Sequence, residues 1–250
     1  MNKLVLISGS SRGLGAAMAK SFSEAGYQVA INYFNSEKEA KDLSEILPNS
    51  SHVFKCDVSN KNEVDSMLVN IKEVFGHSPS ILVNNAMTSY VFNGDDRKNA
   101  DSISWHEIQD HLDVTLKGSL NLIQSLIPSM SENSYGRIIN IGTNLVQNPV
   151  VPYHDYTIAK SALLGLTRTF AKDLGQMGIT VNMISGGLLK ITDASAATPD
   201  FVFDAIAEMT PLKKVTTIEE FSDVVLFFAS DKARSITGQN LIVDGGLTFK

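Results

Sequence analysis

The sequence predicts an α/β protein with a doubly wound parallel sheet of about seven strands and helices on both faces. Two observations lead to this prediction. Short apolar runs alternate with segments of helical periodicity along the whole chain. The first apolar run also leads directly into a glycine-rich turn where a helix can begin. Repeated strand–helix–strand units form parallel sheets with right-handed crossovers, because each helix packs back onto the sheet.

The expected strands are Lys3–Ser8, Gln28–Tyr33, His52–Lys55, Ile81–Asn84, Arg137–Ile141, Ile179–Met183 and Asn240–Val243. The expected helices cover Gly13–Gly26, Ser36–Leu47, Asn62–Phe75, Trp105–Ile127, Tyr153–Leu174, Asp200–Met209 and Ile218–Ala229. Such sheets bind ligands at the carboxyl ends of their strands. We therefore expect the functional residues in the loops after Ser8, Tyr33, Asn84, Ile141 and Met183.

Size and composition limit the classes of protein. The 250 residues contain no linker-like stretch, so we expect one domain over residues 1–250. The formal net charge of −6 without a basic cluster indicates neither a nucleic-acid nor a membrane partner. The run Leu4–Ile7 is too short for a signal-peptide core, and the lone Cys56 cannot form an internal disulfide. We expect a cytoplasmic protein in which Cys56 is a small buried residue rather than a reactive thiol.

A glycine-rich turn follows the first expected strand. Residues 9–15 read Gly-Ser-Ser-Arg-Gly-Leu-Gly, and a helix is expected to begin within them. Glycines let a backbone approach a pyrophosphate closely, and the N–H groups at a helix N-terminus attract the anion. The spacing differs from the Gly-x-Gly-x-x-Gly dinucleotide fingerprint, and tight turns also use glycine for steric reasons alone. We expect a phosphate-binding loop, with a purely structural turn as the alternative.

The end of the second strand indicates which dinucleotide fits. An NAD site places an acid about 20 residues after the glycines, on the ribose 2′-hydroxyl. Here the segment Asn32-Tyr33-Phe34-Asn35-Ser36 carries no carboxylate before Glu37. Arg12 in the glycine loop could pair with a 2′-phosphate. The sequence therefore favours NADP(H), with NAD(H) as the alternative.

Tyr156 and Lys160 lie four residues apart in an expected helix and therefore share one helix face. A free phenol has a pKa of about 10. A neighbouring ammonium favours the phenolate and lowers that pKa, which makes a tyrosine a workable acid and base. Such pairs arise by chance in many helices, but the combination with the glycine loop predicts proton chemistry at Tyr156.

Several motifs resemble the short-chain dehydrogenase/reductase family, most closely its 3-oxoacyl-ACP reductase-like members. The motifs are Ser8–Gly15, Asp57-Val58, Asn84-Asn85-Ala86, Tyr156 with Lys160, Val181-Asn182, Gly238-Gln239 and Val243-Asp244-Gly245-Gly246. The resemblance covers essentially the whole chain and implies a Rossmann-type fold, a nicotinamide cofactor and a carbonyl or acyl-thioester substrate. Because family members are commonly tetramers, it also implies a homotetramer or a dimer.

The resemblance implies roles for individual residues. Tyr156 would protonate the carbonyl oxygen as hydride arrives, Lys160 would bind the nicotinamide ribose, and Thr143 would hold the substrate oxygen. Thr115 occupies the position of an asparagine that supports a water linked to the lysine. The candidate cofactor-binding residues are Gly9, Ser11, Arg12, Gly13, Leu14, Gly15, Asn35, Asp57, Val58, Asn85, Ala86, Tyr156, Lys160 and Gly187.

Four positions around this site depart from the family pattern. Thr143 replaces a serine, Thr115 an asparagine, Met87 a glycine, and Gly186-Gly187 a Pro-Gly pair that would make the loop less flexible. A helix-interface threonine bonded back to a carbonyl and a gap-filling methionine are the simple alternatives for Thr115 and Met87. Together the changes indicate an altered substrate or a slowed proton relay.

Two segments and the histidines complete the predictions. Residues 188–210 are expected to form a lid, and Tyr90–Ser104 either borders the pocket or forms a solvated loop. His154 and Asp155 precede Tyr156, but no third ligand or nucleophile is spaced to join them, so neither a metal site nor a hydrolase is expected. Solvated or capping roles are expected for the other histidines, His52, His77, His106 and His111.

The sequence therefore favours NADPH-dependent reduction of a carbonyl, either a 3-oxoacyl thioester or another small ketone. A nucleotide-binding scaffold or redox sensor with little catalysis is the second hypothesis, motivated by Thr143 and Thr115. A dehydrogenase that oxidises an alcohol with NAD is the third. A sensor would bind NADPH without hydride transfer that depends on Tyr156, so turnover distinguishes it from a reductase.

Overall fold

A computed structural model, which describes residues 3–90, 92, 97–190, 192, 195–196 and 198–249, has one parallel sheet of seven strands. The strands are β1 (Leu4–Ile7), β2 (Gln28–Tyr33), β3 (Ser51–Lys55), β4 (Ile81–Asn84), β5 (Gly136–Thr143), β6 (Ile179–Gly186) and β7 (Asn240–Val243). Their order in the sheet is β3-β2-β1-β4-β5-β6-β7, with every neighbouring pair parallel. The predicted Rossmann-type fold is confirmed.

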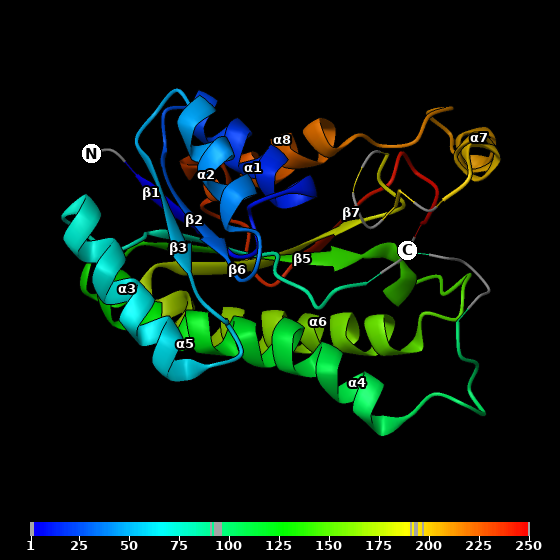
Figure 1. The fold of residues 1–250 in the computed structure, drawn as a ribbon, viewed down its shortest axis with the longest axis horizontal. Helices are drawn as coiled ribbons and strands as arrows, with labels where there is room; N and C mark the ends of the chain where they lie inside the picture. The colour runs from blue at the N-terminus through cyan, green and yellow to red at the C-terminus, as the bar shows by residue number, and fades with distance from the viewer. Residues whose placement is uncertain are drawn as a thin grey trace.

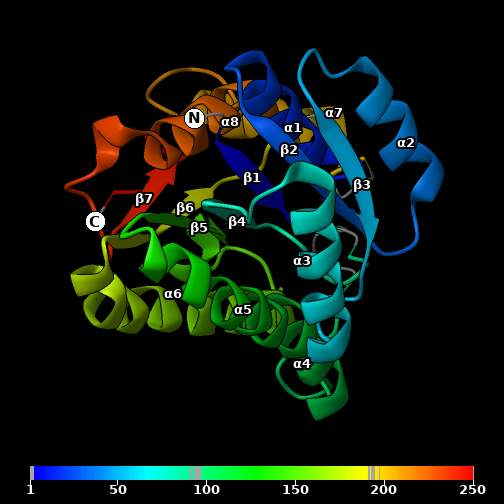
Figure 2. The same cartoon turned by 90° about the vertical axis from the view of Figure 1, so that its left-hand side faces the viewer.

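Helices cover both faces of this sheet (Figures 1 and 2). One face carries α1 (Gly13–Glu24), α2 (Glu37–Ile46) and α8 (Ile218–Ala229). The other carries α3 (Lys61–Phe75), α4 (Trp105–Leu112), α5 (Gly118–Glu132) and α6 (His154–Leu174). The remaining helix, α7 (Asp200–Met209), lies beyond the carboxyl ends of the strands (Figure 1).

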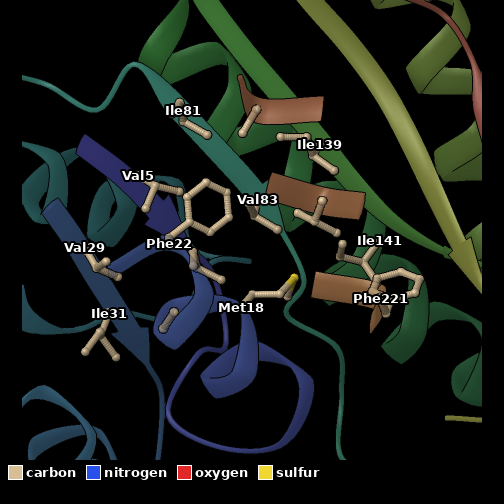
Figure 3. Close-up of a cluster of buried hydrophobic side chains, with 14 of the residues drawn as sticks. Val5, Met18, Phe22, Val29, Ile31, Ile81, Val83, Ile139, Ile141 and Phe221 are labelled. Atoms are coloured by element: carbon tan, nitrogen blue, oxygen red, sulfur yellow. The ribbon is translucent and has the colours of Figure 1, made fainter. Parts of the chain in front are cut away.

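Alternation along each central strand divides the core into two clusters. Successive side chains of a strand point to opposite faces, so Val5 of β1 belongs to one cluster and Leu6 to the other. On the first face, Phe22 of α1 and Phe221 of α8 pack among the strand side chains (Figure 3). Continuous apolar strands are typical of a parallel sheet that is covered on both faces.

Cys56 follows β3 and belongs to the second cluster. Its side chain is buried, and burial raises the pKa of its thiol to about 12. A thiol with such a pKa stays protonated near neutral pH and is a poor nucleophile. The prediction of a small buried core residue is confirmed.

The predicted helix over Trp105–Ile127 is wrong in detail. Helix α4 ends at Leu112, a π-helical turn occupies Asp113–Lys117, and α5 continues to Glu132. The predicted bounds of β2, β4, β7, α7 and α8 match the structure, and the remaining ones differ by a few residues. Strands β5 and β6 are longer than predicted because they pair with each other as far as Thr143 and Gly186, and such pairing is not visible in either segment alone.

The strand order reverses between β1 and β4. Strand β1 pairs with β2 on one side and with β4 on the other, so the loops after β1 and β4 lead to opposite faces of the sheet. A crevice at such a switch point is where doubly wound sheets bind their ligands. Among the described residues, no helix has both the length and the apolar character needed to cross a membrane.

Candidate active site

The glycine loop after β1 forms a tight cradle. Gly9 has a φ of 61°, and a Cβ on it would lie 3.0 Å from the Cα of Ala86. A Cβ on Gly15 would collide with the carbonyl oxygen of Gly9 and would lie 2.9 Å from the side-chain nitrogen of Asn85. Because side chains are excluded at these two positions, the loop backbone can approach a ligand closely.

Polar side chains from neighbouring strands hold this cradle in place. The side-chain amide of Asn85 donates to the carbonyl oxygens of Ser8 and Gly9, at 3.0 and 2.9 Å. The hydroxyl oxygen of Ser8 accepts the backbone N–H groups of Asn85 and Ala86, at 2.9 and 3.0 Å. On β2, the side-chain oxygen of Asn32 accepts the N–H of Gly9 at 3.1 Å. The cradle is therefore fixed by β1, β2 and β4 together.

The start of α1 is suited to an anion. The helix begins at Gly13 and has no acidic residue in its first turn, so nothing there offsets the partial positive charge of its N-terminus. Arg12 is exposed and directly precedes the helix, while Ser11 and Leu14 are half-buried. Asn35 is exposed in the connection from β2 to α2, which carries no carboxylate. The cradle and this helix end can hold a pyrophosphate.

Asp57 and Val58 lie in the loop after β3. The Asp57 carboxylate accepts the N–H and the hydroxyl of Ser59, at 2.9 and 2.7 Å. Val58 is buried, and its carbonyl oxygen accepts the side-chain amide of Asn121 from α5 at 2.9 Å. The structure thus gives both residues fixed positions at the edge where the cradle lies.

The end of β6 meets the C-terminal segment at this edge. Gly186, predicted to lie in a flexible loop, is the last residue of β6 and pairs with Thr143. A Cβ on Gly187 would lie 3.0 Å from the Cβ of Asp244 and 3.2 Å from the side-chain nitrogen of Asn144. Asn144 donates to the Asp244 carboxylate at 3.0 Å. The predicted loop therefore begins one residue later and inside a close-packed junction.

Three predicted catalytic side chains come together at the carboxyl end of β5. Thr143 ends β5, while Tyr156 and Lys160 lie on the first turns of α6, and all three are buried. The hydroxyl groups of Thr143 and Tyr156 share a hydrogen bond. Lys160 Nζ donates to the carbonyl oxygen of Ile141 at 2.7 Å and lies 5.7 Å from the centre of the Tyr156 ring.

Burial dominates the protonation of this pair. It raises the pKa of Tyr156 to about 12, against the hydrogen bond from Thr143, which lowers it. It also lowers the pKa of Lys160 to about 8. The prediction that Lys160 lowers the pKa of Tyr156 is wrong for this structure, because removing the phenolate from water outweighs the favourable interactions. Near neutral pH Tyr156 therefore keeps its phenolic proton, and the pKa of Lys160 lies close to that range.

Comparisons with known proteins agree with this geometry. The sequence model of the family described as enoyl-(acyl carrier protein) reductase matches residues 9–248. The 3-oxoacyl-(acyl-carrier-protein) reductase FabG of Staphylococcus epidermidis is 35% identical over 252 residues, covering 99% of each chain. The D-beta-hydroxybutyrate dehydrogenase of Rhizobium meliloti is 30% identical over 265 residues, again 99% of each. The chain belongs to the short-chain dehydrogenase/reductase family.

In this short-chain dehydrogenase/reductase, Thr115 lies in a distorted helical turn, and its hydroxyl is buried. It is buried in the π-helical turn between α4 and α5, a type of distortion that often occurs at functional sites. Its carbonyl oxygen accepts the hydroxyl of Ser119 at 2.6 Å, but its own hydroxyl has no hydrogen-bond partner among the described residues. The alternative of a hydroxyl bonded back to a carbonyl is therefore wrong. A buried hydroxyl in this state is suited to bind a water or a ligand.

Aromatic side chains surround Tyr156. The Tyr90 ring stacks against the Tyr156 ring at 5.5 Å with an interplanar angle of 21°. Phe92 meets Tyr156 edge-on at 5.3 Å, and Tyr153 meets Tyr90 edge-on at 5.7 Å. Met87 packs against this group, as the gap-filling alternative predicts. The site around Tyr156 is thus apolar and aromatic.

The prediction for the histidines is wrong at one position. His111 is only 3% exposed, and its Nε2 lies 3.6 Å from the carboxylate of Asp155, so it neither caps a helix nor faces solvent. Burial lowers the pKa of His111, while the charge of Asp155 opposes that shift. His106 and His52 are exposed, and His77 is half-buried.

The predicted lid lies partly outside the described residues, at positions 191, 193, 194 and 197. In the described part, the hydroxyl groups of Thr192 and Ser195 lie 2.8 Å apart. Thr198 donates to the carbonyl oxygen of Phe92 at 3.4 Å. The segment Tyr90–Ser104 also has undescribed positions, 91 and 93–96, and its residues Tyr90 and Arg97 both contact Asp155, which directly precedes Tyr156. Within the described ranges, no group of three or more His, Cys, Asp or Glu side chains could hold a metal ion.

Proposed function

We propose that the protein is an NADPH-dependent carbonyl reductase that acts on a 3-oxoacyl thioester or another small ketone. The observation that carries this proposal is the meeting of Thr143, Tyr156 and Lys160 beside the glycine cradle. The names of the relatives, which are a 3-oxoacyl-(acyl-carrier-protein) reductase and a hydroxybutyrate dehydrogenase, also support a substrate with a 3-oxo or 3-hydroxy group. The proposal treats residues 1–250 as one dinucleotide-binding and catalytic domain.

The nucleotide-binding part of the proposal rests on the cradle and the strand-end loops. Gly9, Gly13 and Gly15, with the backbone of Ser11 and Leu14, would hold the pyrophosphate. Asp57, Val58, Asn85, Ala86 and Gly187 would line the rest of the nucleotide. Arg12 and Asn35 would take the 2′-phosphate, since no carboxylate lies there to repel it.

The reaction needs a proton donor, a site for the substrate oxygen and a cation. When bound, the nicotinamide would supply the hydride. Thr143 donates a hydrogen bond to the carbonyl oxygen, and Tyr156 gives that oxygen its proton. The ammonium of Lys160 stabilises the phenolate that remains, and Thr115 holds a water that connects the lysine to solvent.

Turnover tests the proposal directly. NADPH consumption is followed at the nicotinamide absorbance with acetoacetyl thioester and a panel of small ketones. We expect NADPH-dependent reduction of at least one of them. NADPH binding without consumption in the presence of every carbonyl would contradict the reductase.

A scaffold or redox sensor is the second candidate, favoured by the environment of Thr115. A hydroxyl has fewer hydrogen-bonding sites than the amide it replaces, and this one has no partner within the described part of the chain. A slow proton relay would follow. Binding of NADPH with little turnover in the wild type, and faster turnover in Thr115→Asn, would support this candidate.

Arg12→Ala tests the choice of cofactor. We expect the Kd for NADPH to rise about 10- to 100-fold, because the charge-assisted hydrogen bonds to a 2′-phosphate are lost. The Kd for NADH should change less than about threefold. Lys20→Ala, which removes an exposed cation from the same helix α1, is the control and should change neither value. An equal rise in the Kd for NADPH and the Kd for NADH in Arg12→Ala would contradict the NADPH assignment.

The pH profile tests the role of Lys160. With its pKa lowered to about 8, the lysine is charged below that pH and neutral above it. We therefore expect kcat/KM for carbonyl reduction to be level below about pH 8 and to fall by up to about tenfold per unit above it. Lys160→Arg keeps its charge at every pH measured. Its kcat/KM should therefore stay level above about pH 8, even if the variant is slower than the wild type. A wild-type profile that stays level to about pH 10 would contradict this role.

The proposal includes a homotetramer, or a dimer, and a cytoplasmic location as predicted from the sequence. The helices expected at the interface contain Leu112 and Leu163. Leu163 is buried within the chain, whereas Gly165 is exposed on the same helix, with nothing within 4 Å of a Cβ built on it. Light scattering of the purified protein measures the assembly.

A further inference from the structure

Next to the catalytic tyrosine lies a buried carboxylate that the proposed reaction does not use. Asp155 is 3% exposed and occupies the first turn of α6. Its Oδ1 accepts the hydroxyl of Tyr90 at 3.0 Å and the N–H of Tyr156 at 2.9 Å. Its Oδ2 accepts Arg97 Nη2 at 2.9 Å and lies 3.6 Å from Nε2 of His111. We call these four side chains, Asp155, Tyr90, Arg97 and His111, the Asp155 cluster.

The cluster connects parts of the chain that are far apart in sequence. Tyr90 and Arg97 come from the connection between β4 and α4, His111 from α4, and Asp155 from α6. A buried carboxylate is stable only where donors and cations surround it, and this one has a hydroxyl, a guanidinium and a backbone N–H. The carboxylate therefore fixes the connection between β4 and α4 against the start of α6.

One consequence is the position of the Tyr90 ring. Both the Tyr90 hydroxyl and the Tyr156 N–H bind the same oxygen of Asp155, so the two tyrosines share one anchor. The Tyr90 ring lies 5.5 Å from the Tyr156 ring and nearly parallel to it. The guanidinium carbon of Arg97 lies 4.0 Å from the centre of the Tyr90 ring. Ring stacking and the cation both favour this position.

We propose that Asp155 is a positioning residue and Tyr90 a specificity-determining residue: the carboxylate holds the Tyr90 ring beside Tyr156 as a wall that admits ketones with a compact substituent. The inference rests on the proposed carbonyl reduction. The wall is continued by Phe92 and Tyr153, which both contact the Tyr90 ring. A hollow of about 210 Å³ is lined in part by Arg97 and Asp155, and both Asp155 and the Tyr90 side chain are buried.

A matched pair of substrates tests the wall. Acetoacetyl and benzoylacetyl thioesters of the same small thiol differ only in the methyl or phenyl group beyond the ketone. The measured quantity is the ratio of kcat/KM for the benzoylacetyl substrate to that for the acetoacetyl substrate. We expect the wild type to favour the methyl substrate, and Tyr90→Ala to raise the ratio about tenfold or more. An unchanged ratio in Tyr90→Ala would overturn the proposal.

A double-mutant cycle tests the anchor. Tyr90→Phe keeps the ring but loses its hydroxyl, and Asp155→Asn keeps the size of the side chain but loses its charge. Each should raise the ratio by about threefold or more, and the double variant should match the single variants because both act through one contact. Effects that multiply in the double variant would overturn the shared anchor. Lys98→Ala, which breaks the 3.0 Å ion pair of Lys98 with Glu107 between the same connection and α4, is the control and should leave the ratio unchanged.

Hydrogen exchange separates this proposal from the proposed function. If the wild type reduces neither these thioesters nor any ketone of the panel, the proposed function fails, and exchange of the backbone N–H groups of residues 97–104 decides the positioning role. Asp155→Asn and Tyr90→Phe should each speed that exchange by about tenfold or more, whereas Lys98→Ala should do so less. Unchanged exchange in both anchor variants would overturn the positioning role, whatever the activity. If Asp155→Asn does not fold, Tyr90→Phe gives the same decision.

Discussion

Tyr156→Phe is expected to lower kcat/KM for carbonyl reduction by about 10³-fold or more. The phenol is the only group in the proposed reaction that delivers a proton to the carbonyl oxygen, and loss of a positioned acid costs about 10² to 10⁴ in rate. Burial holds the pKa of Tyr156 at about 12, so the group is protonated throughout the working range of pH. The change removes one oxygen and leaves the aromatic stacking in place.

The measurement compares NADPH oxidation and NADPH binding in the same variant. We expect the Kd for NADPH to change less than about threefold, because the cradle lies on β1, β2 and β4. Tyr135→Phe is the matched control, since it removes a phenolic oxygen that accepts the Lys3 ammonium at 2.9 Å, just before the start of β5. It should keep wild-type turnover. Activity in Tyr156→Phe above about one tenth of the wild type would exclude Tyr156 as the proton donor.

The fold was predictable because two short-range signals agree. Apolar runs indicate where the strands lie, and the predicted bounds of β2, β4 and β7 match the structure. The helices between the strands indicate that the strands pair in parallel. The family resemblance led us to expect that Thr143 and Tyr156 meet, and the topology agrees with it by bringing the end of β5 and the start of α6 to one edge of the sheet. The π-helical turn over Asp113–Lys117 was not predictable, since its residues continue the apolar periodicity of an ordinary helix.

The residues that sequence reasoning missed are those whose partners lie far along the chain. Tyr90 and Arg97 are 65 and 58 positions from Asp155, and no spacing rule connects them. Asn32 did leave a signal, because it is a polar residue in an otherwise apolar strand segment. Such a residue needs a buried partner, and it finds the N–H of Gly9.

The protonation states of Tyr156 and Lys160 also could not be predicted from the sequence. The spacing of Tyr156 and Lys160 predicted that they share a face, and the Nζ group does lie over the ring. The spacing could not predict that both side chains are buried. Burial favours the neutral form of each side chain, and so it raises the pKa of Tyr156 and lowers the pKa of Lys160. Desolvation depends on every segment packed around the pair, including the connection from β4 that carries Tyr90.

Thr143→Ala is expected to lower kcat/KM by about 10²- to 10³-fold, whereas Thr143→Ser should stay within about threefold of the wild type. Removing one hydrogen-bond donor to a developing oxyanion has an effect of this size. The hydroxyl also bonds to Tyr156 and lowers its pKa, so its loss makes the phenol a weaker acid. Serine keeps the hydroxyl and loses only the methyl group.

Folding effects cannot account for a loss of that size. The Thr143 hydroxyl oxygen accepts the N–H of Leu145 at 3.3 Å, and losing such a contact costs about 1 kcal/mol of stability. That cost lowers the melting temperature by a few degrees and leaves the protein folded at 25 °C. Kinetics of both variants beside their melting curves therefore isolate the hydroxyl. If serine is as slow as alanine, the hydroxyl is not the functional group, and the methyl of Thr143 is what the site requires.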